Sequence, residues 1–383
     1  MSAHPEGAAK AYGKAAALLE RGASEKAYTA AVLLAARGDE VLLHAAAGEA
    51  HLSSIFDVAS LTKPLVAALF FVLVQQGKVS PGGALAGVLP VSSPDPAFRE
   101  IRFAHLLAHT SGLPAYRRLY ADIRVAEERE KRPLVGRAEG HDLAVATILA
   151  MPLASPPGTR CAYSDLGYIV LGRAIEAAAF ESLDRLLRRE ICGPLKMADT
   201  GYLPLASLSE CETGRLVSTG RSKVRDREKV GEVDDENAAA MGGVAGHAGV
   251  FSTAHDLFLF AREVLRARRG EGRVLARPSA VAMTTRVAEP PGCERTLGFD
   301  TPTPATPPAG ATPAPAPGSQ AGRRFPEGSF GHLGFTGCSL WVDPAPEATV
   351  VLLTNRVFYG EQNDGLKAIR PLIHDAVMEE LVP

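Results

Sequence analysis

A serine and a lysine three positions apart, Ser60 and Lys63, open an apolar stretch of the chain. If residues 60–77 form a helix, as this stretch predicts, the two side chains share a face and the lysine amine lies beside the serine hydroxyl. A serine hydroxyl becomes a nucleophile when an adjacent base accepts its proton, and the free N–H groups of a helix start can hold an oxyanion. Lysine can be that base if its pKa falls well below about 10.4. A serine that merely caps an ordinary helix is the alternative.

A second group of polar residues, Tyr163, Ser164 and Asp165, stands between a proline-rich loop and an apolar run. A phenol held beside a lysine can carry a proton between a serine and a leaving group, so Tyr163 is a candidate catalytic residue. Asp165 can orient Lys63 by hydrogen bonding. A tyrosine packed in a turn is the alternative, because the triplet alone is a weak signal.

The third group, His332, Leu333 and Gly334, lies in a predicted strand from Gly331 to Phe335. A glycine in this strand lets a substrate backbone approach its edge, and the Phe335 N–H is a candidate second oxyanion donor. We expect His332 to line the opposite wall of a cleft. An isolated histidine in a strand is more often structural, which is the alternative.

The elements that must position these residues follow from hydrophobic periodicity and turn signals. The pattern predicts helices at 8–21, 60–77, 253–266 and 364–381. It predicts strands at 28–36, 41–47, 329–335, 339–342 and 348–354. The first two strands form a hairpin around Gly38.

This order of elements indicates an α+β protein with an antiparallel five-stranded sheet flanked by helices. Residues 1–80 and 242–383 are predicted to form the α/β domain, and residues 81–241 a large, mostly helical inserted domain. The active site is then expected between the sheet and the insert. Residues 301–322 are almost wholly Pro, Ala, Thr, Gly and Ser, which predicts a flexible loop.

Composition limits the classes of partner. The 383 residues are 46% hydrophobic, enough for a substantial core, and their formal net charge is only −2. This near balance gives no sign of nucleic-acid binding, and the longest apolar run, Leu65 to Val74, is too short for a membrane span. A small, roughly neutral substrate fits better.

The cysteines and the N-terminus bear on the compartment. Five cysteines are scattered without the short paired spacings of a zinc site, and their odd number argues against a complete disulfide framework. We therefore expect reduced thiols that mostly pack in the interior. No signal peptide is visible, so we expect a cytoplasmic protein unless a leader has been trimmed.

Together the three groups occur in the order that a serine β-lactamase or penicillin-binding fold requires. The chain resembles the class C β-lactamase-like superfamily, which includes family VIII carboxylesterases and D-alanyl-D-alanine peptidases. The strings that carry the resemblance are FDVASLTK at 56–63, HLLAHTSGLP at 105–114, YSDLGY at 163–168, GGVAGHAGVFS at 242–252 and GHLGFTG at 331–337. With their flanking elements they extend from about residue 25 to the end of the chain.

The resemblance implies a β-lactamase/transpeptidase-like fold and a set of roles. Ser60 would be acylated, Lys63 and Tyr163 would handle protons, and the backbone at Phe335 would contribute an oxyanion N–H. Two departures bear on the substrate. Asp165 stands where β-lactamases usually carry Asn, and His332 stands where they carry Lys, so a permanent cation for a substrate carboxylate is missing. Both changes favour small esters over anionic amides.

Three further motifs bear on alternative functions. His105 and His109 have metal-ligand spacing, but no glutamate stands between them as in a His-Glu-x-x-His site, and no metal or organic cofactor is expected. The glycine-rich stretch 242–249 lacks the ending of a phosphate loop, and a tight turn near the cleft is the better interpretation. No Gly-x-Ser-x-Gly surrounds Ser60, so an α/β-hydrolase is not indicated. A β-lactamase, a D-alanyl-D-alanine carboxypeptidase, and a sensor or scaffold that binds without turnover stay as alternatives to a carboxylesterase.

Overall fold

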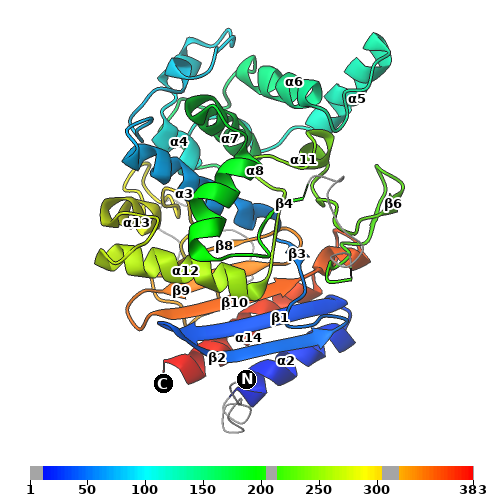
Figure 1. The fold of residues 1–383 in the computed structure, drawn as a ribbon, viewed down its shortest axis with the longest axis vertical. Helices are drawn as coiled ribbons and strands as arrows, with labels where there is room; N and C mark the ends of the chain where they lie inside the picture. Colours follow the sequence, from blue (N-terminus) through cyan, green and yellow to red (C-terminus); the bar gives the residue numbers. More distant parts are fainter. Residues whose placement is uncertain (1–11, 204–213, 304–318, 383) are drawn as a thin grey trace.

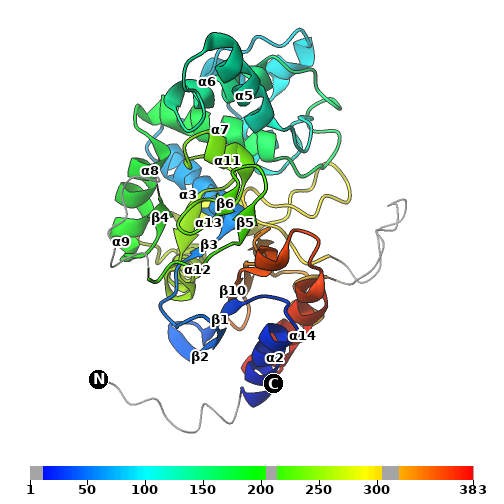
Figure 2. The same ribbon diagram turned by 90° about the vertical axis from the view of Figure 1, so that its right-hand side faces the viewer.

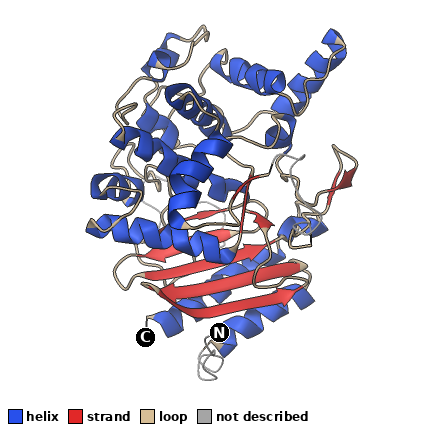
Figure 3. Cartoon of the chain, viewed as in Figure 1, coloured by secondary structure: helices blue, strands red, loops and turns tan. Residues whose placement is uncertain are grey.

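A five-stranded antiparallel sheet forms the base of the molecule, as the sequence predicts (Figures 1 and 3). The computed structural model describes residues 12–203, 214–303 and 319–382. The order of strands in the sheet is β2-β1-β10-β9-β8. Their bounds are β1 Ala30–Arg37, β2 Glu40–Gly48, β8 Phe330–Leu333, β9 Ser339–Asp343 and β10 Ala348–Thr354. The N-terminal hairpin is joined to the C-terminal strands where β1 pairs with β10, in the register Ala31 to Thr354.

Both faces of strand β1 are buried. Side chains alternate along a strand, and Val32 and Leu34 of β1 join one apolar cluster whereas Leu33 joins another. The second cluster includes Leu19 and Ile373, from helices α2 (Gly13–Ser24) and α14 (Gly365–Leu381). Figure 2 shows these two helices together on one side of the sheet. Helix α12 (Ala254–Arg269) packs on β1 and β10 from the other side.

The apolar stretch that starts at Ser60 is a buried helix. A 3₁₀ turn, η1 (Ala59–Leu61), leads into α3 (Thr62–Gln75), which is somewhat shorter than the predicted 60–77. All residues from Thr62 to Leu73 are buried, which explains why the segment is apolar on every side. In Figure 1 this helix lies between the sheet and the helices above it.

Above α3, the regular structure between the two halves of the sheet consists mainly of helices joined by loops. Its helices are α4 (Phe103–Leu107), α5 (Leu119–Glu130), α6 (Ala138–Leu149), α7 (Asp165–Ala179), α8 (Leu183–Leu186), α9 (Gly193–Leu195) and α11 (Glu236–Ala240), with a π-helical turn at Leu187–Cys192. Helix α13 (Arg277–Thr284) follows α12. Two small sheets complete the fold: β3 (Phe56–Asp57) and β4 (Gly201–Tyr202) flank β7 (Val250–Ser252), and β5 (Arg221–Ser222) pairs with β6 (Arg227–Glu228). The domain boundaries at 80 and 242 stay a prediction.

The last part of the chain differs from the sequence prediction at the end of one strand. The strand predicted at 329–335 ends at Leu333, because the chain turns at Gly334, whose N–H donates to the Cys338 carbonyl at 2.7 Å. The flexible loop predicted at 301–322 falls largely on residues 304–318, which lie outside the described residues. Among the helices of the described ranges, none has the length and apolar character needed to cross a bilayer.

Candidate active site

Ser60 and Lys63 meet at the start of the buried helix. The Lys63 Nζ atom lies 2.8 Å from the Ser60 Oγ atom, so the spacing that suggested the pair does bring it together. The serine is half-buried, whereas the lysine side chain is completely buried. Ala59, directly before the serine, has a φ of +47°, which residues with a side chain rarely adopt. The nucleophile candidate therefore stands on a constrained turn.

Lys63 is surrounded by oxygen atoms. Besides Ser60, its Nζ contacts the Asp165 carboxylate at 2.8 Å and the His247 carbonyl at 3.0 Å. Three acceptors match the three N–H bonds of an ammonium group. Burial lowers the pKa of Lys63, but the neighbouring Asp165 and Tyr163 raise it by more, so this pKa lies above its ordinary value. The condition under which Lys63 could be the base, a pKa well below about 10.4, is therefore not met.

Tyr163 reaches the same serine from the helical region. Its hydroxyl donates to the Ser60 Oγ atom at 2.8 Å, and the Lys63 Nζ lies 4.8 Å from the centre of its ring. The histidine ring of His109 packs against it, with centroids 4.5 Å apart. His109 also fixes the backbone around the tyrosine, since its carbonyl accepts from the Ala162 N–H and its Nδ1 from the Ser164 N–H. This histidine is thus part of the support of Tyr163, which explains it without a metal.

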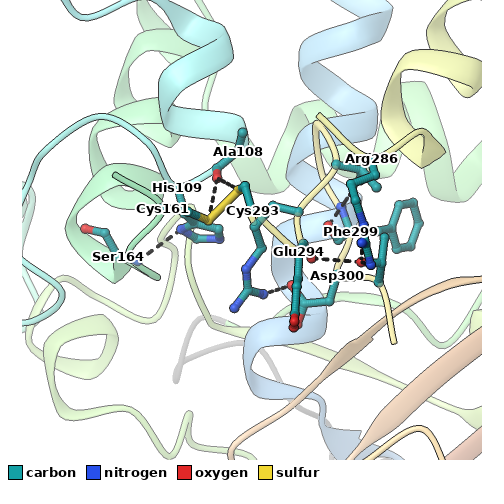
Figure 4. The surroundings of a disulfide bond; sticks show 12 residues. Ala108, His109, Cys161, Ser164, Arg286, Cys293, Glu294, Phe299 and Asp300 are labelled. Carbon is teal, nitrogen blue, oxygen red and sulfur yellow. Dashed lines mark hydrogen bonds and ion pairs between the residues drawn. A yellow bond between two sulfur atoms is a disulfide. The ribbon is translucent and has the colours of Figure 1, made fainter. Parts of the chain in front are cut away.

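A disulfide joins Cys161, two residues before Tyr163, to Cys293 (Figure 4). The expectation that the cysteines are reduced thiols is wrong for this pair, whereas Cys192 and Cys338 are free and buried. The odd number of cysteines did not exclude a single bridge across 132 residues of sequence. Disulfides persist mainly in oxidising compartments, and the compartment of this protein stays a prediction.

Arg295 is a member of the site that the sequence did not suggest. Its guanidinium lies 5.1 Å from the centre of the Tyr163 ring and forms an ion pair with Asp300. Asp300 is itself held against β8, where it exchanges two backbone hydrogen bonds with Gly331 at 2.7 and 3.0 Å. A cation is therefore present near the tyrosine, although His332 replaces the lysine of related proteins. Only the fold shows this, because Arg295 lies in a loop without periodic pattern.

His332 is buried. Its side chain is 3% exposed, its Nδ1 lies 2.8 Å from the Leu333 carbonyl oxygen, and its Nε2 lies 3.8 Å from Asp300. Burial and the positive charges of Lys63 and Arg295 hold its pKa well below its ordinary value, so the ring is neutral at pH 7. Its ring lies 6.1 Å from that of Tyr163, centroid to centroid, and its place in a cleft wall stays a prediction.

Gly334 and Phe335 lie in the turn after β8. A Cβ atom on Gly334 would come within 2.5 Å of the Val58 carbonyl oxygen, so the glycine permits contact with the turn before Ser60. Its predicted role, to admit a substrate backbone, stays a prediction. The Phe335 carbonyl accepts from the Arg356 guanidinium at 2.9 Å. Within the described residues no acceptor takes up the Phe335 N–H, which is free for an oxyanion.

Comparison with known proteins agrees with this arrangement. The Beta-lactamase family matches residues 15–372 of the chain. A protein of Escherichia coli K12 with the provisional name D-alanyl-D-alanine carboxypeptidase is 29% identical over 323 residues, covering 79% of this chain and 69% of its own. The N-acetylmuramyl-L-alanine amidase of Bacillus subtilis 168 is 29% identical over 325 residues, covering 79% and 68%.

Solved structures show the same fold. The crystal structure of EstCE1, described as a hydrolase with promiscuous acyltransferase activity, superimposes with a TM-score of 0.68 at 20% identity, covering 96% of this chain and 99% of that one. The family match spans both halves of the sheet and the helical region that carries Tyr163. The chain belongs to the Beta-lactamase family, a family of serine hydrolases.

Proposed function

We propose that this protein is a serine hydrolase that forms an acyl-enzyme on Ser60 and acts best on small esters. The observation that carries the proposal is that one oxygen atom, Ser60 Oγ, contacts both the Lys63 amine and the Tyr163 hydroxyl at 2.8 Å. A nucleophile needs a base within this distance, and two proton-carrying groups are within reach.

Tyr163, rather than Lys63, is the proposed base. The raised pKa of Lys63 keeps it an ammonium group at neutral pH. The Lys63 amine and the Arg295 guanidinium lie 4.8 and 5.1 Å from the centre of the Tyr163 ring. In the form that has lost its own proton, Tyr163 accepts the proton of Ser60 while Lys63 holds the serine oxygen in place, a contribution typically worth about 10²- to 10⁴-fold in rate.

The proposed reaction has two steps. Ser60 Oγ attacks the ester carbonyl, its proton passes to Tyr163, and the tetrahedral oxyanion is held by the N–H groups of Ser60 and Phe335. The ester bond then breaks, Tyr163 returns the proton to the departing alkoxide, and an alcohol leaves. Water attacks the acyl-enzyme by the same route, which releases a carboxylic acid and restores the serine hydroxyl.

Esters are preferred over anionic amides because the polar groups of the site are already paired. Asp165 binds Lys63 and, as a carboxylate, cannot donate to an acylamino oxygen. His332 is neutral and buried, and Arg295 is paired with Asp300. No unpaired cation among these residues is left to attract a substrate carboxylate.

A second candidate is cleavage of D-alanyl-D-alanine peptides. Arg295 favours it, since its side chain is 22% exposed beside Tyr163 and could exchange Asp300 for a substrate carboxylate. The name of the Escherichia coli relative points the same way.

Turnover of three substrates by the purified protein tests the proposal: a short-chain nitrophenyl ester, a chromogenic cephalosporin and a D-alanyl-D-alanine peptide. We expect the highest kcat/KM for the ester and no turnover of any substrate by S60A. A clear preference for the cephalosporin or the peptide would reject the ester assignment, and R295Q would then identify the role of the cation. Stable labelling by penicillin without turnover of any substrate would indicate a sensor instead.

A further inference from the structure

The side chain of Asp57 is a buried carboxyl group three residues before the nucleophile candidate. It is 1% exposed and accepts two backbone hydrogen bonds. One comes from the Ala59 N–H to Oδ1 at 2.8 Å, and the other from the Asp234 N–H to Oδ2 at 2.6 Å. Both carboxylate oxygens are therefore engaged with the backbone, and no cationic side chain of the described residues forms an ion pair with them.

The first of these bonds acts on the turn that presents Ser60. Ala59 has a left-handed backbone, and such a residue keeps this conformation only when its surroundings hold it. The Asp57 carboxylate fixes the Ala59 N–H from two residues away, as in an Asx turn. The second bond ties this turn to the loop before α11.

The backbone carbonyl of Asp57 holds a second turn, which carries Phe335 and Thr336. Its carbonyl oxygen accepts from the hydroxyl of Thr336 at 2.8 Å, and Thr336 is fully buried directly after Phe335. The close approach of Gly334 to the Val58 carbonyl reinforces this contact. Thus one residue is bonded to both turns that carry the proposed oxyanion donors, the N–H groups of Ser60 and Phe335.

Burial of the Asp57 carboxyl group is energetically unfavourable. Burial and the neighbouring Asp234 raise the pKa of Asp57 to about 7, and the cation nearby, Lys229, pairs with Asp234 instead. An apolar side chain would avoid this cost but could not accept the Ala59 N–H.

We propose that Asp57 is a positioning residue for the reaction, which sets the two oxyanion donors relative to each other through Ala59 and Thr336. This inference rests on the function proposed above. It assigns no contact between Asp57 and the substrate: the residue acts on the transition state through the backbone that it holds.

Steady-state kinetics of D57A, D57N and T336V on a short-chain nitrophenyl ester test the inference. Loss of an oxyanion donor typically lowers kcat by about 10²- to 10³-fold, and a displaced donor should approach that range, so we expect D57A to lose about 10- to 100-fold in kcat with little change in KM. Asn keeps one acceptor oxygen, so D57N should retain more activity than D57A. T336V removes the hydrogen bond from Thr336 to the Asp57 carbonyl and leaves the carboxyl group intact, so kcat should also fall. T336S keeps a hydroxyl for this hydrogen bond, so the fall in kcat should not occur.

The chain offers a matched control in Asp95, far from these turns in sequence. Its carboxylate also accepts from the N–H two residues ahead, Ala97 at 3.0 Å, and from a distant N–H, Leu153 at 3.3 Å. D95A also removes a carboxylate that accepts two backbone hydrogen bonds, so it should lower the stability of the fold. Its kcat should stay near that of the wild type. Thermal unfolding of each variant shows which of them are folded under the assay conditions.

The outcomes separate this inference from the proposed function. If D57A and T336V are folded and turn over the ester within about twofold of the wild type, the positioning role is wrong while the hydrolase assignment stands. An equal loss of kcat in D95A would also overturn it. If the wild type neither turns over the ester nor reacts with a fluorophosphonate at Ser60, the function and the inference fail together.

Discussion

The phenolic oxygen of Tyr163 lies 2.8 Å from the hydroxyl oxygen of Ser60, although 103 residues separate them in the sequence. The serine stands at the start of the buried helix α3, and the tyrosine directly before α7. The contact therefore depends on how the helical region packs on α3, with His109 and the Cys161–Cys293 bridge next to the tyrosine.

Removing the phenolic oxygen should stop proton transfer. We expect Y163F to lower kcat for the ester by about 10²- to 10⁴-fold, the usual contribution of general acid–base catalysis. Y168F is the matched control, because the hydroxyl of Tyr168 donates to the Leu107 carbonyl and not to Ser60. Steady-state kinetics of both variants provide the check. Equal activity of Y163F and the wild type would remove Tyr163 from the mechanism.

Asp165 should control the ionisation of Lys63. Its carboxylate raises the pKa of Lys63, whereas burial lowers it. D165N removes the negative charge, so the pKa of Lys63 should fall. If the ammonium form is the active one, the alkaline fall of kcat/KM moves to lower pH in D165N. The pH profiles of the two proteins between about 6 and 10.5 measure this shift. Higher activity of D165N at neutral pH would instead identify neutral Lys63 as the base.

The disulfide should stabilise the fold. A bridge that closes a long loop typically adds about 2–4 kcal/mol to the free energy of unfolding, chiefly by restricting the unfolded chain. The double variant C161S/C293S should lose an amount in this range, measured by urea denaturation. A reductant should destabilise the wild type but leave the double variant unchanged, because Cys192 and Cys338, the other cysteines of the described residues, are free. A wild type insensitive to reductant would contradict the bridge.

His374 should make stability depend on pH. It is fully buried, with Nε2 3.1 Å from the Ser339 hydroxyl and Nδ1 3.1 Å from the Ala321 carbonyl oxygen. Burial and the nearby Arg370 lower its pKa to about 3. Between pH 6.5 and 3 the unfolded chain binds a proton here that the folded chain does not, so stability is lost as the pH falls through this window.

Comparison with H374Q isolates this contribution. Below pH 6.5, the free energy of unfolding of the wild type should fall relative to that of H374Q. The expected fall is up to about 1.4 kcal/mol per pH unit. Urea denaturation at pH 7.5, 6.0 and 5.0 measures it. A difference that stays constant over this range would show that folding does not lower the pKa of this histidine.

Local patterns in the sequence were sufficient to predict much of this structure. The alternating apolar residues of β1 and β10 have two buried faces to fill, and the i, i+3 spacing of Ser60 and Lys63 is a property of any helix. The contact between Asp165 and Lys63 was also expected from the residues. These features depend on neighbours in the chain or on a strong motif.

The features that were not predicted depend on long-range packing. Arg295 and Cys293 lie in a loop without period, and the pairing of cysteines cannot be deduced from their positions alone. The raised pKa of Lys63 results from a balance between burial and two neighbouring side chains, which only coordinates reveal. The end of β8 at Leu333 coincides with the turn at Gly334, whose N–H donates to the Cys338 carbonyl.

The most direct test of the central claim is to find the residue that becomes covalently modified. The wild type and S60A are treated with a fluorophosphonate, digested and mapped by mass spectrometry. The account predicts one adduct per chain, on Ser60, accompanied by loss of ester turnover, and neither adduct nor turnover in S60A. An adduct on a different residue, or an S60A protein that still hydrolyses the ester, would contradict it.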